Sequence, residues 1–93
     1  PFRVCEMLAT AEGAAYIARV ALYNPVQVNR AKKAIRRAFE TQMAGLGFSL
    51  VEVLSACPTN WGLTPLEALK LVEEKMVPVY PLGEFKVPEE VKS

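Results

Sequence analysis

FSLVEVLSACPTNWG, Phe48 to Gly62, joins a nearly unbroken apolar run to a polar turn that carries a cysteine. A short run rich in Val and Leu that follows a helix predicts a buried strand of a mainly parallel sheet. We therefore expect a strand over Phe48–Leu54. In such sheets ligands collect beyond the carboxyl ends of the strands, so any chemistry of the chain is expected in the turn Ser55–Trp61.

The residues before this strand predict a second strand and the helix that joins the two. Ala14–Leu22 alternates its side chains around a single charge, Arg19, which is typical of a strand covered on both faces. Asn24 is a good N-cap and Pro25 suits the first helical position, so a helix is expected from there to about Ala44. Its predicted buried stripe is Val28, Ala31, Ile35, Ala38, Phe39 and Met43. Two strands joined by such a helix form one right-handed crossover of a parallel sheet.

The residues after the turn predict another helix and a proline-rich end. Thr64-Pro65-Leu66-Glu67 is a capping box with proline at the first helical position, which is a specific signal for a helix start. The predicted core face of this helix is Leu66, Leu69, Val72 and Met76. Val77–Gly83 is at most an edge strand, because its prolines cannot donate to a ladder.

Length and composition limit the classes of function. The 93 residues suit one small domain, an α/β fold with a short first helix over Arg3–Ala11. We divide it into residues 1–83 and a tail, 84–93. A net charge of +1 gives no field that calls for nucleic acid or an anionic membrane, and no apolar run is long enough to span one. Two widely spaced cysteines favour a reducing, cytoplasmic setting.

Three features outside the turn have competing interpretations. Cys5 lies off the apolar stripe of its helix and is taken as a small hydrophobe beside the core. Arg19 either reaches solvent along its stem or is directed at an anion. The basic run consists of Arg30, Lys32, Lys33, Arg36 and Arg37. We interpret this run as a solvated helix face, with a docking surface for an acidic partner or a nucleic-acid site as the alternatives.

Cys57 has three interpretations from its residues alone. It can be a thiol at the edge of the core, a nucleophile or a metal ligand. A nucleophilic cysteine needs a base or a depressed pKa, and the chain has no histidine. An iron–sulfur cluster takes four thiolates, so further ligands would have to come from sequence that is not present. Composition therefore ranks the core thiol first and the ligand second.

Several segments carry a resemblance to a known family. They are Ala15–Val20, the Asn24–Pro25 helix with Ala31-Lys32-Lys33, Gly47–Leu54, Ser55–Trp61 and Pro81–Lys86. The chain resembles the C-terminal part of the thiamine-pyrophosphate-binding β subunit of 2-oxoacid:ferredoxin oxidoreductases, of the 2-oxoisovalerate or 2-oxoglutarate type. The likeness covers nearly the whole chain. Its most specific part is Cys-Pro-Thr-Asn-Trp followed by Thr-Pro-x-Glu-Ala and Tyr-Pro-Leu-Gly.

The resemblance implies a fold, a reaction and one site residue. The fold would be the C-terminal part of a thiamine-diphosphate-binding domain, with a mainly parallel sheet flanked by helices. The enzyme would oxidatively decarboxylate a 2-oxoacid to an acyl-CoA, using thiamine diphosphate, Mg²⁺ and a [4Fe-4S] cluster that passes electrons to ferredoxin. In family members that hold this cluster, the fourth cysteine ligand lies in the turn matching Cys57, which is therefore the implied ligand in the intact subunit. Ala56 stands where proline is frequent in the family, a change that should not affect ligation. No catalytic residue is assigned.

The family motifs that are missing imply a fragment. The N-terminal cysteine ligands and the Gly-Asp-Gly…Asn motif for magnesium and the diphosphate are absent. We expect a C-terminal piece that is inactive alone and binds neither cofactor tightly. Its partners would be the rest of the β subunit, the α and other subunits, and ferredoxin, with coenzyme A and a 2-oxoacid as substrates. An exposed sheet edge would favour self-association of the piece. The alternative function is a small interaction module that docks an acidic partner through its basic helix.

Overall fold

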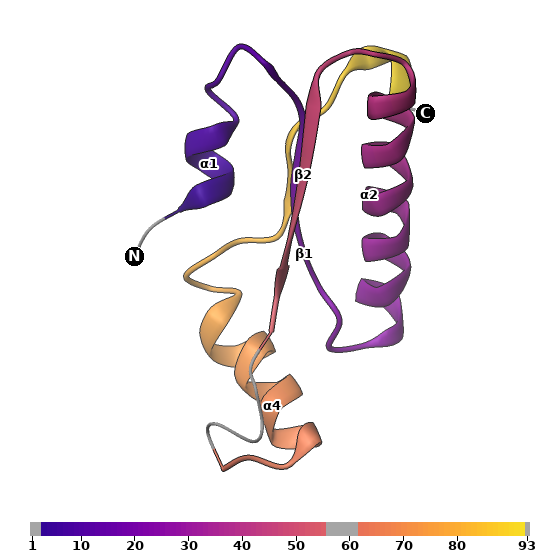
Figure 1. Cartoon of the computed structure of the whole chain (residues 1–93). Helices are drawn as coiled ribbons and strands as arrows, with labels where there is room; N and C mark the ends of the chain where they lie inside the picture. The colour runs from indigo at the N-terminus through magenta and orange to yellow at the C-terminus, as the bar shows by residue number, and fades with distance from the viewer. Residues whose placement is uncertain (1–2, 56–61, 93) are drawn as a thin grey trace.

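A sheet with helices on both faces forms the body of the chain (Figure 1). The computed structural model describes residues 3–55 and 62–92. Its regular elements are α1 (Val4–Leu8), β1 (Ala14–Ala21), α2 (Pro25–Met43), β2 (Phe48–Leu54), α4 (Pro65–Leu71), a π-helical turn (Val72–Met76), β3 (Gly83–Lys86) and a 3-10 turn (Glu89–Val91). Helix α1 lies on one face of the sheet and α2 on the other (Figure 1). The predicted α/β class is confirmed.

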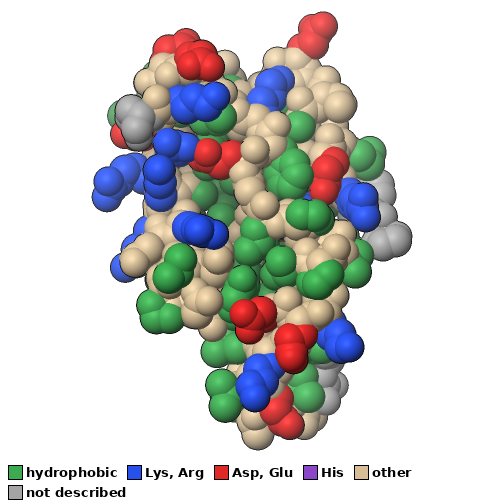
Figure 2. All heavy atoms as spheres, turned by 180° about the vertical axis from the view of Figure 1, so that it is seen from behind, with side chains coloured by type: hydrophobic (Ala, Val, Ile, Leu, Met, Phe, Trp, Pro, Cys, Tyr) green, Lys and Arg blue, Asp and Glu red, His purple; other side chains and the backbone are tan. Residues whose placement is uncertain are grey.

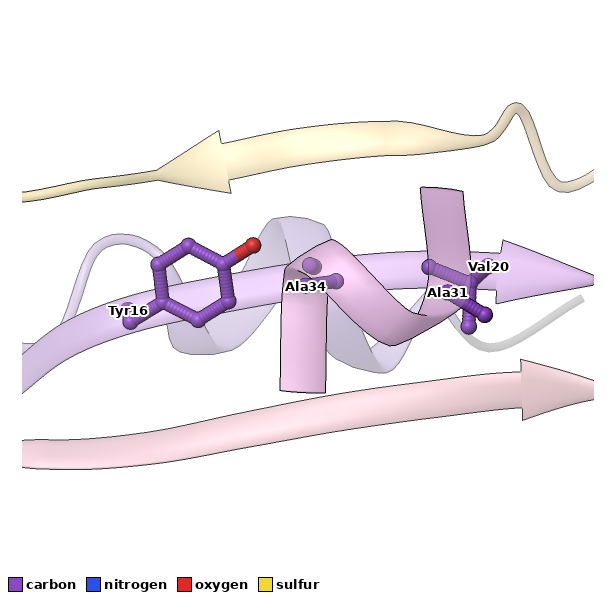
Figure 3. Close-up of a cluster of buried hydrophobic side chains, with 5 residues drawn as sticks. Tyr16, Val20, Ala31 and Ala34 are labelled. Carbon is purple, nitrogen blue, oxygen red and sulfur yellow. The ribbon is translucent and has the colours of Figure 1, made fainter. Parts of the chain in front are cut away.

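The sheet has three strands in the order β2-β1-β3. Strands β1 and β2 are parallel, with Arg19 opposite Glu52, and α2 makes the crossover between them, as predicted. Strand β3 runs antiparallel on the other side of β1, so the sheet is mixed (Figure 3). All eight residues of β1 are buried, because a central strand with helices on both faces has no exposed side.

Small side chains let α2 lie close to the sheet. Tyr16 and Val20 of β1 pack against Ala31 and Ala34 of α2 in one buried cluster (Figure 3). The predicted cap is present, since the Asn24 side chain accepts a hydrogen bond of 2.9 Å from the backbone N–H of Gln27.

Glycine is required where α2 turns into β2. Gly47 has φ +145°, and a Cβ atom there would lie 2.7 Å from the carbonyl oxygen of Gly13. A side chain would therefore clash with the backbone and strain the turn between α2 and β2.

The predicted buried stripe of α2 was partly wrong. Ala31 is buried, but Ile35, Phe39 and Met43 are 43%, 67% and 88% exposed. The buried face is instead formed by Gln27, Ala31, Ala34, Arg37 and Thr41. Tyr16 and Val20 fill the space above β1, so alanines lie against them and the bulkier apolar residues face outward.

The C-terminal third departs further from the prediction. The capping box is confirmed, because Thr64 and Glu67 each accept a hydrogen bond from the other's backbone N–H. Val72 is buried, and Met76 packs against the cluster around it, as expected. Leu66 and Leu69 are 64% and 40% exposed, so that part of the predicted core face was wrong.

The last strand also begins later than expected. Strand β3 covers Gly83–Lys86, beyond the prolines, instead of Val77–Gly83. It pairs with β1, and Lys86 Nζ donates to the carbonyl oxygen of Ala11 at 3.0 Å, so these residues are part of the sheet. The division of the chain at residue 83 stays a prediction. Within the two described ranges, no helix is both long and apolar enough to cross a membrane.

We expect the isolated chain to self-associate. Strand β2 is an edge of the sheet, and the exposed apolar side chains of Ile35, Phe39 and Met43 recur every fourth residue along α2. Sedimentation velocity over a range of concentrations should show this association, and Phe39→Glu should weaken it about tenfold. The change Asn29→Glu on the same helix is the control, since it adds the same charge without removing apolar surface. A monodisperse wild-type monomer at every concentration would contradict the prediction.

Candidate functional site

The carboxyl ends of β1 and β2 meet over a small apolar cluster. Ala21 and Leu54 are buried there with Val72, and partly buried side chains of the C-terminal third surround them. The chain leaves this cluster at Ser55, which is exposed, and the described structure resumes at Gly62 before α4. The predicted ligand Cys57 and its neighbours Ala56 to Trp61 lie outside the described residues, so its assignment as a cluster ligand stays a prediction.

No metal site is assembled from the side chains that the structure describes. Residues 3–55 and 62–92 contain no group of three or more His, Cys, Asp or Glu side chains placed to hold an ion. The chain has two cysteines in all, whereas an iron–sulfur cluster of this type takes about four thiolates. A cluster held by Cys57 would therefore need ligands from sequence outside this chain.

The second cysteine is a structural thiol. Cys5 is fully buried, as predicted, and its Sγ lies 3.2 Å from Glu52 Oε1 and 3.5 Å from the carbonyl oxygen of Ala18. Burial and the carboxylate of Glu52 raise the pKa of the Cys5 thiol to about 12. Because the thiolate is the form that attacks or binds metal, Cys5 is poorly suited to either role.

Arg19 is buried at the centre of an ionic network with two partly exposed carboxylates. Its guanidinium donates to both carboxylate oxygens of Glu6, at 2.8 and 3.0 Å, and its Nε donates to Glu52 Oε1 at 2.8 Å. Its Nη1 also donates to the carbonyl oxygen of Pro81 at 3.1 Å. The side chain is fully buried, so the solvated interpretation of Arg19 was wrong and its anions come from this chain.

The network joins parts of the chain that are far apart in sequence. Glu6 comes from α1, Arg19 from β1 and Glu52 from β2, while the rings of Tyr80 and Phe85 lie 5.4 and 5.2 Å from the guanidinium carbon. The carboxylate of Glu6 first, and that of Glu52 after it, raise the pKa of Arg19, although burial acts in the opposite direction. Arg19 in turn lowers the pKa of Glu6.

A sequence signal for the network was present. Arg19 and Glu52 are the single charges of their two strands, have opposite signs and are paired in register. Oppositely charged residues on neighbouring strands predict a mutual ion pair when one of them is buried, because a buried charge needs a partner.

The basic run of α2 divides into two parts. Arg30, Lys32, Lys33 and Arg36 are exposed, as predicted, and basic side chains gather over the edge of the molecule where α2 lies (Figure 2). Arg37 was predicted to be solvated with them, but it is buried and its Nη1 contacts both carboxylate oxygens of Glu84 at 2.6 Å. The prediction failed for Arg37 because β3 brings this carboxylate to α2.

Glu84 is held by two groups. The Tyr16 hydroxyl donates to Glu84 Oε2 at 2.6 Å, and Arg37 supplies the charge. Burial alone would raise the pKa of Glu84, but the hydrogen bonds from Tyr16 and Arg37 outweigh it and lower the pKa. Burial and the neighbouring carboxylate raise the pKa of Tyr16, which therefore stays a neutral donor.

Several known proteins similar to this chain are oxidoreductase subunits. The chain is 38% identical over 86 residues to the ketoisovalerate oxidoreductase subunit VorA of Methanothermobacter thermautotrophicus, a match that covers 92% of the chain and 18% of that subunit. It is 38% identical over 74 residues to the 2-oxoglutarate synthase subunit KorB of Archaeoglobus fulgidus, a match that covers 80% of the chain and 25% of that subunit. The KorB subunit of Methanocaldococcus jannaschii is 34% identical over 80 residues.

These matches cover most of the chain but only a small part of each relative. The chain spans between 18% and 26% of the length of these subunits. No family model and no solved structure matches the chain.

Proposed function

The chain is a homologue of one segment of the VorA and KorB subunits of 2-oxoacid:ferredoxin oxidoreductases, and on this premise we propose that it is part of the subunit that binds thiamine diphosphate. The intact enzyme would oxidatively decarboxylate a 2-oxoacid and deliver the electrons to ferredoxin, with coenzyme A accepting the acyl group. The observation that carries the proposal is the extent of the match, which includes 92% of the chain for VorA.

The cofactors of this proposal would come largely from outside the chain. When bound, thiamine diphosphate with Mg²⁺ supplies the stabilised carbanion needed for decarboxylation, and the [4Fe-4S] cluster supplies one-electron transfer. The chain would contribute the thiolate of Cys57. The remaining cluster ligands and the diphosphate-binding motif would belong to other parts of the subunit.

The described residues would act as the support for the cysteine turn. On the near side of the turn Leu54 is buried, and on the far side Val72 packs against it and Ala21. The ion pairs of Arg19 with Glu6 and Glu52 hold α1 and both parallel strands together, close to the carboxyl ends of these strands. A support of this kind restricts where a ligand residue can move, as ligation requires.

The proposal predicts activity only in the assembled enzyme. The 93-residue chain alone should give no 2-oxoacid-dependent reduction of a viologen dye under anaerobic conditions. The intact subunit that contains this segment, co-expressed with its partner subunits, should reduce the dye with 2-oxoisovalerate or 2-oxoglutarate in the presence of coenzyme A. Each 2-oxoacid has to be assayed separately, because the chain is 38% identical both to VorA and to the KorB of A. fulgidus. Absence of dye reduction with either 2-oxoacid, from a fully assembled and cofactor-loaded complex, would overturn the proposal.

A second candidate function is suggested by the exposed cations of α2. Arg30, Lys32, Lys33 and Arg36 form a continuous basic surface that suits an acidic protein. Such an interaction module would bind as the isolated chain and lose affinity as salt is raised. The enzyme proposal requires the other subunits instead, so binding and activity assays on the isolated chain separate the two.

A further inference from the structure

A groove runs between α2 and β3 on the side of the sheet away from α1. Its volume is about 270 Å³, and its floor is apolar, formed by Ala18, Val20, Ala34 and Leu82. Three cations of α2 stand along its wall: Arg30, Lys33 and Arg37. None of these three cations belongs to the cysteine turn or to the Arg19 network.

The groove already holds a carboxylate. Glu84 of β3 lines the groove, contacts Arg37 Nη1 at 2.6 Å and accepts from the Tyr16 hydroxyl at 2.6 Å. The charge of Arg37 is thereby balanced. The pair shows that an oxyanion fits between this face of α2 and the edge of the sheet.

Two further cations line the groove. Arg30 and Lys33 are exposed and form no ion pair with any residue in the described ranges 3–55 and 62–92. They are three residues apart on one helix, so their side chains are neighbours on the same face. A guanidinium offers a fork of donors and an ammonium offers a point charge, and the apolar floor strengthens their field at the groove.

We propose that this groove binds a small oxyanion ligand, with one carboxylate or phosphate group seated on Arg30 and Lys33. The ligand lies over the apolar floor beside the Arg37–Glu84 pair. Glu84 repels it, since a second anion comes close to a resident carboxylate. The site is independent of the proposed oxidoreductase function and uses no residue of the cysteine turn.

The test is a titration of the ¹⁵N-labelled 93-residue chain with citrate and, separately, with inorganic phosphate, followed by NMR at constant ionic strength. Saturable shifts are expected at the backbone amides of the groove residues Ala34 and Gly83. The anion with the lower Kd shows whether Arg30 and Lys33 prefer a carboxylate or a phosphate group. Shifts that rise linearly with ligand concentration and never saturate, or shifts absent from Ala34 and Gly83, would overturn the proposal.

Two matched variants of α2 distinguish binding in the groove from binding to basic charge in general. Arg30→Gln should weaken binding about tenfold, because it removes a charge-assisted hydrogen bond from the groove. Arg36→Gln removes the same charge from a position that does not line this groove, and should leave the affinity within about twofold. Equal weakening by both variants, or weakening by Arg36→Gln alone, would overturn the proposal.

Removing the resident carboxylate provides an independent test with the opposite sign. Glu84→Gln removes the negative charge that repels the ligand and should tighten citrate binding severalfold. The amide can still accept from the Tyr16 hydroxyl, and a well-dispersed NMR spectrum checks that the variant is folded. If the folded Glu84→Gln chain binds citrate with unchanged or lower affinity, the ligand does not bind beside Glu84 and the proposal is wrong. If this variant does not fold, the comparison of Arg30→Gln with Arg36→Gln decides.

Discussion

Replacing Arg19 by alanine is expected to lower the free energy of unfolding by about 2–5 kcal/mol, mainly because it empties a fully buried position in the sheet. Glu6 and Glu52 also lose their shared cation, although each is 31% exposed and therefore partly screened by water. A small domain is stabilised by only about 5–15 kcal/mol in total, so this variant should lie at or beyond the limit of stable folding. The change removes the hydrogen bonds of the guanidinium to Glu6, Glu52 and Pro81 and its contacts with two aromatic rings. It also leaves a cavity at the junction of α1 with the sheet.

Urea unfolding of the isolated chain, followed by far-UV circular dichroism, measures this effect. Arg36→Ala is the matched control, because Arg36 is exposed on α2, and its replacement should change the free energy of unfolding by no more than about 0.5 kcal/mol. Arg19→Lys keeps the charge but loses the bidentate contact with Glu6, so it should lie between wild type and Arg19→Ala. If Arg19→Ala unfolds at the same urea concentration as Arg36→Ala, the network contributes little to stability and our account of the buried pair is wrong.

The local signals in the sequence located most of the elements. Asn24 and Thr64 mark where helices begin and Gly47 marks where β2 begins, and each acts through groups within a few residues or through its own backbone angles. The bounds of β1 and β2 were also predicted within one residue, because an apolar run is informative without knowledge of the partner strand. The predicted burial holds for β1 but was wrong for β2, where only Leu54 is buried because this strand is an edge of the sheet. Such features depend on the chain itself and can be predicted before its packing is known.

Features that depend on distant contacts were harder to predict. Arg37 is buried because Glu84 approaches it from β3, which is 47 residues further along the chain. The face of α2 that meets the sheet is set by the bulk of Tyr16 and Val20 in another element. Strand β3 forms where β1 offers a free edge, and its four residues carry too little pattern to be found alone. Arg19 and Glu52 were the exception, since their opposite charges on neighbouring strands could have been paired from the sequence.

The two cysteines of the chain allow a direct comparison of a proposed ligand with a structural thiol. Cys57→Ser in the intact subunit, prepared anaerobically with its partner subunits, is expected to remove the iron of one cluster, about four atoms. Dye reduction that depends on the 2-oxoacid should fall close to background. The physical reason is that a serine hydroxyl is not ionised near neutral pH and is a much weaker ligand of iron than a thiolate.

Cys5→Ser makes the same chemical change at the other position and serves as the control. The thiol of Cys5 is fully buried against Glu52 and Ala18, and a serine hydroxyl can donate to the same oxygens, so iron content and dye reduction should stay close to wild type. Iron per subunit, counted for both variants and for wild type, separates a lost ligand from a general loss of folding. If Cys57→Ser keeps its iron and its rate, Cys57 is a core thiol and the proposed ligand is wrong, even though the homology to the oxidoreductase subunits stands. If both variants lose iron equally, the loss reflects a damaged subunit, and the assignment of Cys57 loses its support.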